Sequence, residues 1–445
     1  MAGYSGIELN ERLRYRRAVE AALWGSQLVN VDAMRQAYFR DVQASYNDIM
    51  FFSAPADWRY QTTTPNNSTN YVQFFVNTAD GPVVVEVPPV GAAGLFGSLV
   101  DAWNHALIDV GDAGFDEGHG GRYLVLPPGY DGPVADGYIA VPAATFNVYA
   151  LLRVIPKSGG AEDIAAAIDY LKQLRIHPLG AEATPRFIDI SGTTFDGVPA
   201  YDASYYTSLA RMVAEEPVAE RDLTTMGQLH SIGIGKDTPF QPDSASQAMF
   251  AEAITEAHAW MVDGFRNAGF AWWPDRQWRF LVDEEFLNVP GHDYAVAGRV
   301  LYDIRAINGY AVFAPTNGAP PNLYIKTHVD ASGELLDGSA NYRLRVPPNV
   351  PTGQFWSVVA YDSDTAAFIR DAEVVGVDSY RELRANDDGS IDLHFGPASP
   401  PGAESNWIDT TNARNFFLLF RLYAAPPEVL QRSSPWTLDD VRRAK

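Results

Sequence analysis

The chain has 445 residues, of which 47% are hydrophobic, 20% charged and 12% aromatic. That length is too great for one hydrophobic core, so we expect two packed globular domains without extended disorder. A formal net charge of −22 repels phosphate backbones and anionic bilayers, which argues against nucleic-acid and membrane partners. The lack of cysteine excludes disulfides, thiolate nucleophiles, zinc–thiolate sites and iron–sulfur clusters.

Residues 1–45 form the first predicted region, which is helical. Between Leu9 and Gln43 apolar residues recur at roughly helical spacing, with charged residues between them. Charges also interrupt the stretch from Met1 to Val31, which therefore lacks the apolar segment of a signal peptide. As the chain stands we expect a cytoplasmic protein, or a secreted or periplasmic one if a leader was removed.

Residues 46–180 form the second predicted region, a β-sandwich domain. Two β-rich runs flank Asn77–Gly81, and this arrangement is typical of a β-hairpin. Further short strands are expected over 121–130 and 138–155. An apolar face at helical spacing predicts one helix over Ala161–Leu174.

Residues 181–310 are predicted to be a helical connecting region and residues 311–445 a second β domain. In the connecting region the helices are expected over Tyr201–Glu215, Leu223–Ile232, Ser244–Asn267 and Val296–Asn308. The last third has short strand-like runs separated by clusters of turn formers. This pattern favours a mainly β protein with helical insertions (α+β), built from two jelly-roll-like antiparallel β-sandwich domains, over a βαβ array.

Several strings resemble a bacterial two-domain family of unknown function. Those in the first half resemble domain-of-unknown-function family 1254 and comprise Asn66–Tyr71, VVVEVPP at 83–89, DAWNHALIDVG at 101–111 and GRYLVLPPGY at 121–130. Those in the second half resemble its usual companion, family 1214, and comprise residues 335–362, DDGSIDLHF at 387–395, SNWID at 405–409 and FFLLFRLY at 416–423. The resemblance implies jelly-roll-like sandwiches, similar to those of some glycan-processing enzymes and viral capsid proteins, and assigns no activity.

A first group of candidate site residues lies at 101–105. Together with Asn104, Trp103 and His105 are candidates for lining a sugar-sized cleft and binding substrate there, with Asp101 as a catalytic acid or base. The alternative is structural, with Trp103 in the core and Asp101 capping a turn.

A second group lies on the predicted strand that contains Trp356 and Tyr361. Alternation places Trp356 and Val358 on one face of this strand. Trp356 and Tyr361 are candidates for substrate binding, and Asp362 at the strand exit is a candidate acid or base. Ordinary turn chemistry in the Asp-Ser-Asp sequence is the alternative for Asp362.

The remaining substrate-binding candidates are Asn406 and Trp407 on a loop, Arg421 in an otherwise apolar strand, and Tyr71. Trp407 either forms a pocket wall or closes one end of the sandwich. If Arg421 is buried, we expect it to pair with a carboxylate, and Asp362 and Asp409 are the candidates.

No motif indicates a metal or an organic cofactor. The sequence has no GxGxxG after a strand, no P-loop, no GxSxG and no HExxH, and its eight histidines show no metal-ligand spacing. The Asp-rich stretch 385–392 leaves a Ca²⁺ loop as an alternative to a hairpin turn. We predict no cofactor.

Two functions are compatible with these residues. The first is a hydrolase or lyase that acts on a carbohydrate or small polar metabolite in a cleft between the β domains, with Asp101 or Asp362 as acid or base. A paired-carboxylate mechanism needs two carboxyl groups about 5–10 Å apart in one pocket. The alternative is a non-catalytic ligand-binding or self-assembling structural module, forming a homo-oligomer.

Overall fold

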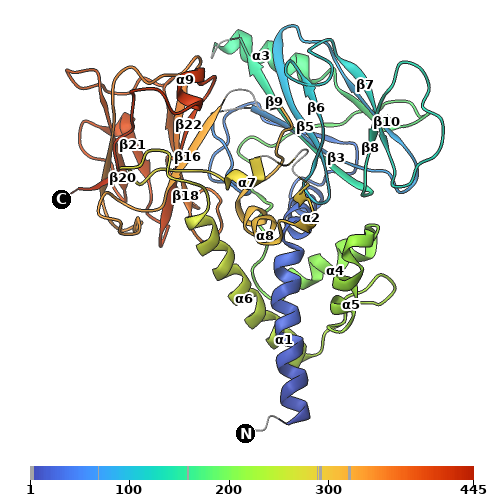
Figure 1. Cartoon of the computed structure of the whole chain (residues 1–445). Coiled ribbons are helices and arrows are strands. Elements are labelled where there is room, and N and C mark those ends of the chain that lie inside the picture. The colour runs from blue at the N-terminus through green and yellow to red at the C-terminus, as the bar shows by residue number, and fades with distance from the viewer. Residues whose placement is uncertain are drawn as a thin grey trace.

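The computed structural model describes residues 5–68, 70–157, 160–287, 289, 293–318 and 322–444. Figure 1 shows two β-rich domains side by side, the N-terminal one in blue to cyan and the C-terminal one in orange to red. Most of the helices lie below and between these domains, and the N-terminal end of the first helix extends away from both. Helix accounts for 26% and strand for 27%, so helices contribute about as much structure as strands.

The helices fall close to the predicted ranges, with one exception. They are α1 (Gly6–Trp24), α2 (Ser26–Arg40), α3 (Ala161–Leu171), α4 (Tyr205–Glu215), α5 (Leu223–His230), α6 (Ser244–Asn267), α7 (Glu284–Leu287), α8 (Tyr302–Ala311) and α9 (Pro427–Leu430). The helix predicted from Val296 begins only at Tyr302, because Gly298, at φ +82°, turns the chain between two short paired strands. No described helix is long and apolar enough to cross a membrane.

The N-terminal domain contains a larger and a smaller sheet. In spatial order the larger sheet consists of β11 (Phe187–Asp189), β1 (Ile49–Phe51), β3 (Asn70–Asn77), β9 (Asn147–Pro156), β5 (Ala93–Asp101) and β6 (Ala106–Gly111). The smaller sheet consists of β10 (Arg175–Pro178), β4 (Val83–Val87), β7 (Gly121–Leu126) and β8 (Ile139–Pro142). A separate pair joins β2 (Tyr60–Gln61) to β12 (Phe195–Asp196).

The hairpin predicted around Asn77–Gly81 is wrong. Strand β3 pairs with β1 and β9, whereas β4 pairs with β10 and β7, so the turn carries the chain from one sheet to the other. The physical reason is burial. Val72 and Phe74 of β3 share one hydrophobic core with Val85 of β4, which requires the two strands to face each other rather than to lie side by side.

The C-terminal domain also contains two sheets. Its larger sheet consists of β13 (Arg279–Phe280), β16 (Leu323–Thr327), β22 (Phe416–Leu422), β18 (Trp356–Asp362) and β19 (Gly376–Asp378). Its smaller sheet consists of β21 (Trp407–Asp409), β20 (Ile391–Gly396), β17 (Tyr342–Val346) and β23 (Arg442–Arg443), and a separate hairpin joins β14 (Ala295–Val296) to β15 (Arg299–Val300). The expected combination of mostly antiparallel sheets with helices is confirmed, and the jelly-roll arrangement stays a prediction.

Candidate functional site

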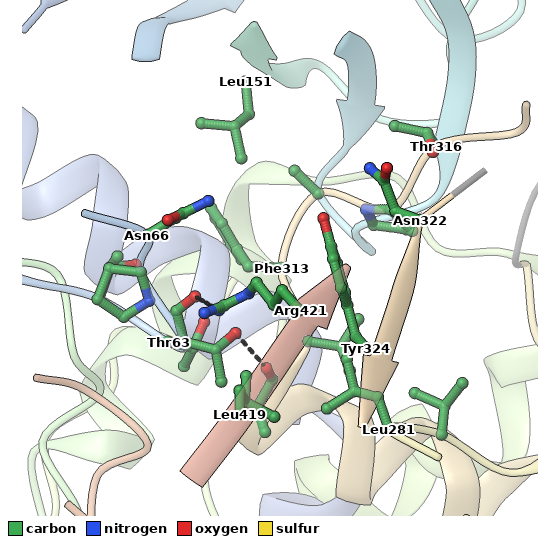
Figure 2. Close-up of a pocket in the computed structure, with 18 of the residues that line it drawn as sticks. Thr63, Asn66, Leu151, Leu281, Phe313, Thr316, Asn322, Tyr324, Leu419 and Arg421 are labelled. Atoms are coloured by element: carbon green, nitrogen blue, oxygen red, sulfur yellow. Dashed lines mark hydrogen bonds between the residues drawn. The ribbon is translucent and has the colours of Figure 1, made fainter. Parts of the chain in front are cut away.

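A pocket of about 270 Å³ lies where the two larger sheets meet the segments around α7 and α8. Its wall draws on strands β3, β5 and β9 of the N-terminal domain, on β16 and β22 of the C-terminal domain, and on residues 280–287 and 311–316 between them. Figure 2 shows side chains from these separate parts of the chain converging on one space. The pocket is therefore a product of domain packing.

The N-terminal wall is the second face of the larger sheet. Side chains alternate along a strand, so Val154 of β9 enters the sandwich core while Arg153 faces the pocket. Arg153 lies opposite Tyr71 on β3 and opposite Phe96 on β5. Its guanidinium carbon is 5.6 Å from the centroid of the Tyr71 ring, within cation–π range.

The C-terminal wall repeats this arrangement with a second tyrosine–arginine pair. Tyr324 on β16 lies opposite Arg421 on β22, and the Arg421 guanidinium carbon is 5.5 Å from the ring centroids of both Tyr324 and Tyr361. Nη2 of Arg421 donates to the Tyr361 hydroxyl at 2.6 Å and to the Thr64 carbonyl at 3.4 Å. The other terminal nitrogen, Nη1, is buried and has no hydrogen-bond partner among the residues that the structure describes. Arg421 is 4% exposed.

Neither arginine is paired with a carboxylate among the described residues, and the described pocket wall contains no Asp, Glu, His or Cys. The expected partnership of Arg421 with Asp362 or Asp409 is therefore wrong, because tyrosine rings and hydroxyls surround the guanidinium instead. Arginine stays protonated in proteins. The wall consequently holds two positive charges, one of them almost fully buried, without a compensating protein anion.

The rest of the wall is largely apolar and aromatic. Phe280, Leu281, Phe313 and Leu419 contribute to it, and Figure 2 shows Leu281, Phe313 and Leu419 around the space beside Arg421. Such a surface favours an apolar body over a heavily hydroxylated one, since each buried polar group of a ligand needs a partner.

Residues 62–64 form a fixed edge of the pocket. The Thr64 amide donates to the Ala366 carbonyl at 2.7 Å, and its hydroxyl donates to the Ala311 carbonyl at 2.9 Å. Thr62 and Thr63 also line the pocket, and the buried hydroxyl oxygen of each lacks a hydrogen-bond partner in the described part of the chain. The edge thus presents two unused hydroxyls from a backbone that is held in place.

The candidates at 101–105 lie outside the described pocket wall and support it from behind. Asp101 Oδ1 accepts hydrogen bonds from the amides of Trp103 and His105, at 2.8 and 3.0 Å, so this carboxylate shapes a turn. Trp103 is buried edge-on against Trp24, with ring centroids 4.9 Å apart. These contacts agree with the structural alternative, in which Asp101 caps a turn and Trp103 lies in the core.

Asn104, in the same turn, connects directly to the pocket. Its Oδ1 accepts from the Ala314 amide at 2.8 Å, and its Nδ2 donates to the Val312 carbonyl at 3.1 Å. Both Val312 and Ala314 line the pocket. Asn104 has a φ of +61°, a conformation that Asn and Gly tolerate best, so the turn holds a wall segment in position.

Among the C-terminal candidates, Tyr361 contacts the site through Arg421, whereas Asp362 and Trp356 do not line the described wall. Asp362 Oδ1 accepts from the Asp364 amide at 2.7 Å, as the turn alternative expects, and burial raises the pKa of the Asp362 carboxyl. Trp356 stacks on Phe420 at 5.6 Å between ring centroids, which makes it part of the internal packing.

Asn406 and Trp407 have structural contacts away from the pocket. Asn406 Oδ1 accepts from the Arg384 amide at 2.8 Å, and its Nδ2 donates to the Arg384 and Asp392 carbonyls. The indole of Trp407 donates to the Gly396 carbonyl at 2.9 Å.

The Asp-rich stretch 385–392 closes as a turn in which Asp388 Oδ1 accepts from the Ser390 amide at 2.9 Å. In the part of the chain that the structure describes, no three His, Cys, Asp or Glu side chains cluster as metal ligands.

Of the residues predicted from sequence, Tyr71 and Arg421 line the pocket. Thr69, which lies in the Asn66–Tyr71 string, is outside the described residues. Sequence reasoning missed Arg153 and Tyr324. A usable signal existed for Arg153, because it is the one charged residue in the strand NVYALLRVIP, as Arg421 is in its own strand.

Comparison with known proteins identifies two family domains. Residues 46–178 match the profile described as protein of unknown function (DUF1254), and residues 321–427 match protein of unknown function (DUF1214). No match was found among curated proteins.

One solved structure shares the fold across nearly the whole chain. The VPA0106 protein of Vibrio parahaemolyticus is 19% identical, with a TM-score of 0.52 over 97% of this chain and 100% of that one. An uncharacterised protein of Burkholderia cenocepacia is 14% identical, with a TM-score of 0.42 over 98% and 96% of the two chains. At this identity the VPA0106 likeness supports the two-domain architecture and carries no activity.

Proposed function

We propose that this protein, which belongs to the two-domain family that joins a DUF1254 domain to a DUF1214 domain, binds a small organic carboxylate with an apolar body in its pocket. The descriptions of the two domains name no activity, so the proposal rests on the pocket. This is the ligand-binding alternative of the sequence analysis, now with a defined place and a defined ligand chemistry.

The observation that carries the proposal is the unpartnered Nη1 of Arg421. A buried donor without an acceptor costs free energy, and a buried charge without a counterion costs more. A carboxylate in the pocket supplies both the acceptor and the countercharge, and the planar guanidinium suits carboxylate geometry. Arg153 on the opposite wall adds a second positive charge.

The protein's large negative charge does not overrule this local preference. A unit charge about 4 Å from a guanidinium gains about 4 kcal/mol at an effective dielectric constant of about 20. Exposed charges more than about 8 Å away are largely screened at physiological ionic strength. The two arginines therefore dominate the potential that a ligand meets inside the pocket.

The lining and the volume restrict the rest of the ligand. Aromatic and aliphatic side chains such as Phe280, Phe313 and Leu419 favour an apolar body. The pocket, at about 270 Å³, is close to the lower end of the range of ligand sites, which is about 300–1,000 Å³. An aryl or short alkyl carboxylate fits these limits better than an oligosaccharide.

The hydrolase hypothesis receives less support from the same geometry. Paired-carboxylate hydrolysis requires two carboxyl groups in one pocket, and the described wall contains none. Asp101 and Asp362 are engaged in turns instead. Binding without acid–base chemistry is therefore the function we put forward.

Thermal unfolding with matched acid and amide pairs tests the proposal. Phenylacetate and phenylacetamide, or octanoate and octanamide, differ in charge while their bodies stay the same. A ligand at about 100 times its dissociation constant adds about 2.7 kcal/mol of stability, which raises the melting temperature by a few degrees. We expect the acids to stabilise the protein and the amides to have little effect.

Two variants localise the effect. Arg421→Met removes the buried charge and keeps an apolar stem, and it should abolish the stabilisation by acids. Arg414→Met is the matched control, because Arg414 is exposed in the same domain and does not line the pocket. Equal stabilisation by acid and amide, or no stabilisation by any acid, would overturn the proposal.

A further inference from the structure

The carboxylate site has a second set of unused polar atoms beside it. Thr62 and Thr63 are 5% and 4% exposed, both line the pocket, and the buried hydroxyl oxygen of each has no hydrogen-bond partner. A hydroxyl both donates and accepts, so a partner group that also donates and accepts satisfies it most completely. An aliphatic alcohol is the simplest such group.

These hydroxyls belong to the same short segment that contacts the buried guanidinium. Nη2 of Arg421 donates to the Thr64 carbonyl, and consecutive Cα atoms along the chain are about 3.8 Å apart. Figure 2 shows Thr63 and Arg421 on the wall of one pocket. The Thr62 and Thr63 hydroxyls therefore belong to the wall segment that contacts Arg421, which is the segment nearest the carboxylate end of a ligand held there.

The segment is fixed before a ligand arrives. Thr64 is held through its amide to Ala366 and through its hydroxyl to Ala311, and the Tyr361 hydroxyl donates to the Pro65 carbonyl. The backbone next to Thr62 and Thr63 is therefore anchored on both sides of its contact with Arg421 before a ligand arrives. An analogue that fills the space beside the two hydroxyls without offering a hydrogen bond leaves them unpaired, so it gains no affinity from them.

We propose that the ligand is a 2-hydroxy or 3-hydroxy carboxylic acid with an apolar body, whose carboxylate is held by Arg421 and whose hydroxyl is held by Thr62 and Thr63. This inference rests on the proposed function and adds the hydroxyl as a second recognised group. The two threonines are then specificity residues, because they distinguish a hydroxy acid from the plain acid.

Calorimetric titration of matched acids tests the hydroxyl. Mandelate and phenylacetate differ by one hydroxyl at carbon 2, and 3-hydroxy-3-phenylpropanoate and 3-phenylpropanoate differ by one hydroxyl at carbon 3. For at least one pair we expect the hydroxy acid to bind at least tenfold more tightly, which corresponds to about 1.4 kcal/mol. Arg421→Met should weaken both members of that pair.

Substitutions that replace only a hydroxyl localise the preference. Thr63→Val and Thr62→Val keep the branched shape, and we expect one or both to bring the affinities of the pair to within about twofold, about 0.4 kcal/mol. Thr207→Val is the matched control, since Thr207 is exposed on α4, does not line the pocket and should leave the preference unchanged.

The possible outcomes separate this inference from the proposed function. Equal affinities within both pairs for the wild-type protein would overturn the hydroxy-acid inference and leave carboxylate binding intact. A preference that survives in both Thr62→Val and Thr63→Val would overturn the assignment to these residues. Failure of every acid to bind would overturn the proposed function and this inference together.

Discussion

The two walls of the pocket contain the same cross-strand pair in different surroundings. Tyr71 faces Arg153 in the N-terminal sheet, and Tyr324 faces Arg421 in the C-terminal sheet. Arg153 is only partly buried, whereas Arg421 is 4% exposed and anchored through Nη2 to Tyr361. The same cross-strand pairing of tyrosine with arginine therefore leaves Arg153 partly solvated on one wall and Arg421 fixed and desolvated on the other.

The difference shows that the environment of each arginine, rather than its residue type, sets its expected contribution to ligand binding. Electrostatic interactions strengthen as water is excluded, and a positioned donor loses less entropy on binding. Arg421 should therefore anchor the ligand and Arg153 should assist. The Tyr361 hydroxyl, which accepts from Nη2 of Arg421 behind the C-terminal wall, accounts for the positioning of this guanidinium.

The largest expected effect is on Arg421. Arg421→Met should lower the affinity for an acid that binds the wild-type protein by about a hundredfold, because truncating one partner of a buried, hydrogen-bonded charge pair costs about 2–5 kcal/mol. Calorimetric titration measures the change. Arg421→Lys keeps the charge without the planar fork and should recover only part of the loss. An unchanged affinity in Arg421→Met would contradict the assignment of Arg421 as the residue that anchors the ligand.

Arg153 should matter less. Arg153→Met is expected to weaken binding of the same acid about tenfold, or about 1.4 kcal/mol. This lies at the lower end of the range for hydrogen bonds to charged groups, about 1.5–3 kcal/mol, because Arg153 retains contact with water. The same titration gives the ratio of the two losses. A larger loss in Arg153→Met than in Arg421→Met would reverse the assignment of anchor and assistant.

Asn104 tests the support behind the wall. Asn104→Ala removes the hydrogen bonds to Val312 and Ala314 and should weaken binding about threefold, consistent with about 0.5–1.5 kcal/mol per net hydrogen bond. Asn104→Gly is a useful companion, since it also removes the side chain but tolerates the positive φ. Equal losses in the two variants assign the effect to the hydrogen bonds, and an effect confined to Asn104→Ala would assign it to backbone strain instead.

The smallest expected effect is that of pH. Arginine stays protonated, and burial raises the pKa of Tyr361 to about 12, so neither partner titrates near neutrality. Affinity for a fully ionised acid should therefore stay constant between about pH 6 and pH 9, where a general acid or base would titrate. A bell-shaped dependence would favour the enzyme hypothesis.

The raised pKa of Tyr361 also has a consequence for stability at high pH. Below about pH 10 the phenol is neutral in both the folded and the unfolded chain, and its burial adds no pH dependence. Between about pH 10 and pH 12 only the unfolded phenol ionises, so stability falls as pH rises by up to about 1.4 kcal/mol per unit.

Local features of the sequence predict local structure well here and long-range pairing poorly. The helix expected over Ser244–Asn267 is α6, whose periodic apolar face was visible in the sequence. The hairpin prediction at Asn77–Gly81 is wrong because the turn does not determine whether β3 and β4 pair in one sheet or face each other from two sheets. The hydrophobic core that the two strands share determines this. Turn formers mark where a chain turns without marking which partner it meets.

The same difference between local and long-range features explains which pocket residues the sequence predicts. Arg421 stands out as one charge in an apolar strand, and Tyr71 lies within the residues that match the DUF1254 profile. Arg153 carries the same signal as Arg421, but only the register that sets it opposite Tyr71 shows that it faces the pocket. The chemistry of their carboxyl groups makes Asp101 and Asp362 candidate acids or bases from the sequence. In the structure each carboxylate accepts a hydrogen bond from a backbone amide within a turn.

A crystal structure with a bound aryl or alkyl carboxylate would test the central claim most directly. The account predicts a carboxylate oxygen at hydrogen-bonding distance, about 2.7–2.9 Å, from Nη1 of Arg421, with the apolar body against Phe313 and Leu419. A ligand bound elsewhere, or bound in this pocket with its carboxylate directed away from Arg421, would contradict it.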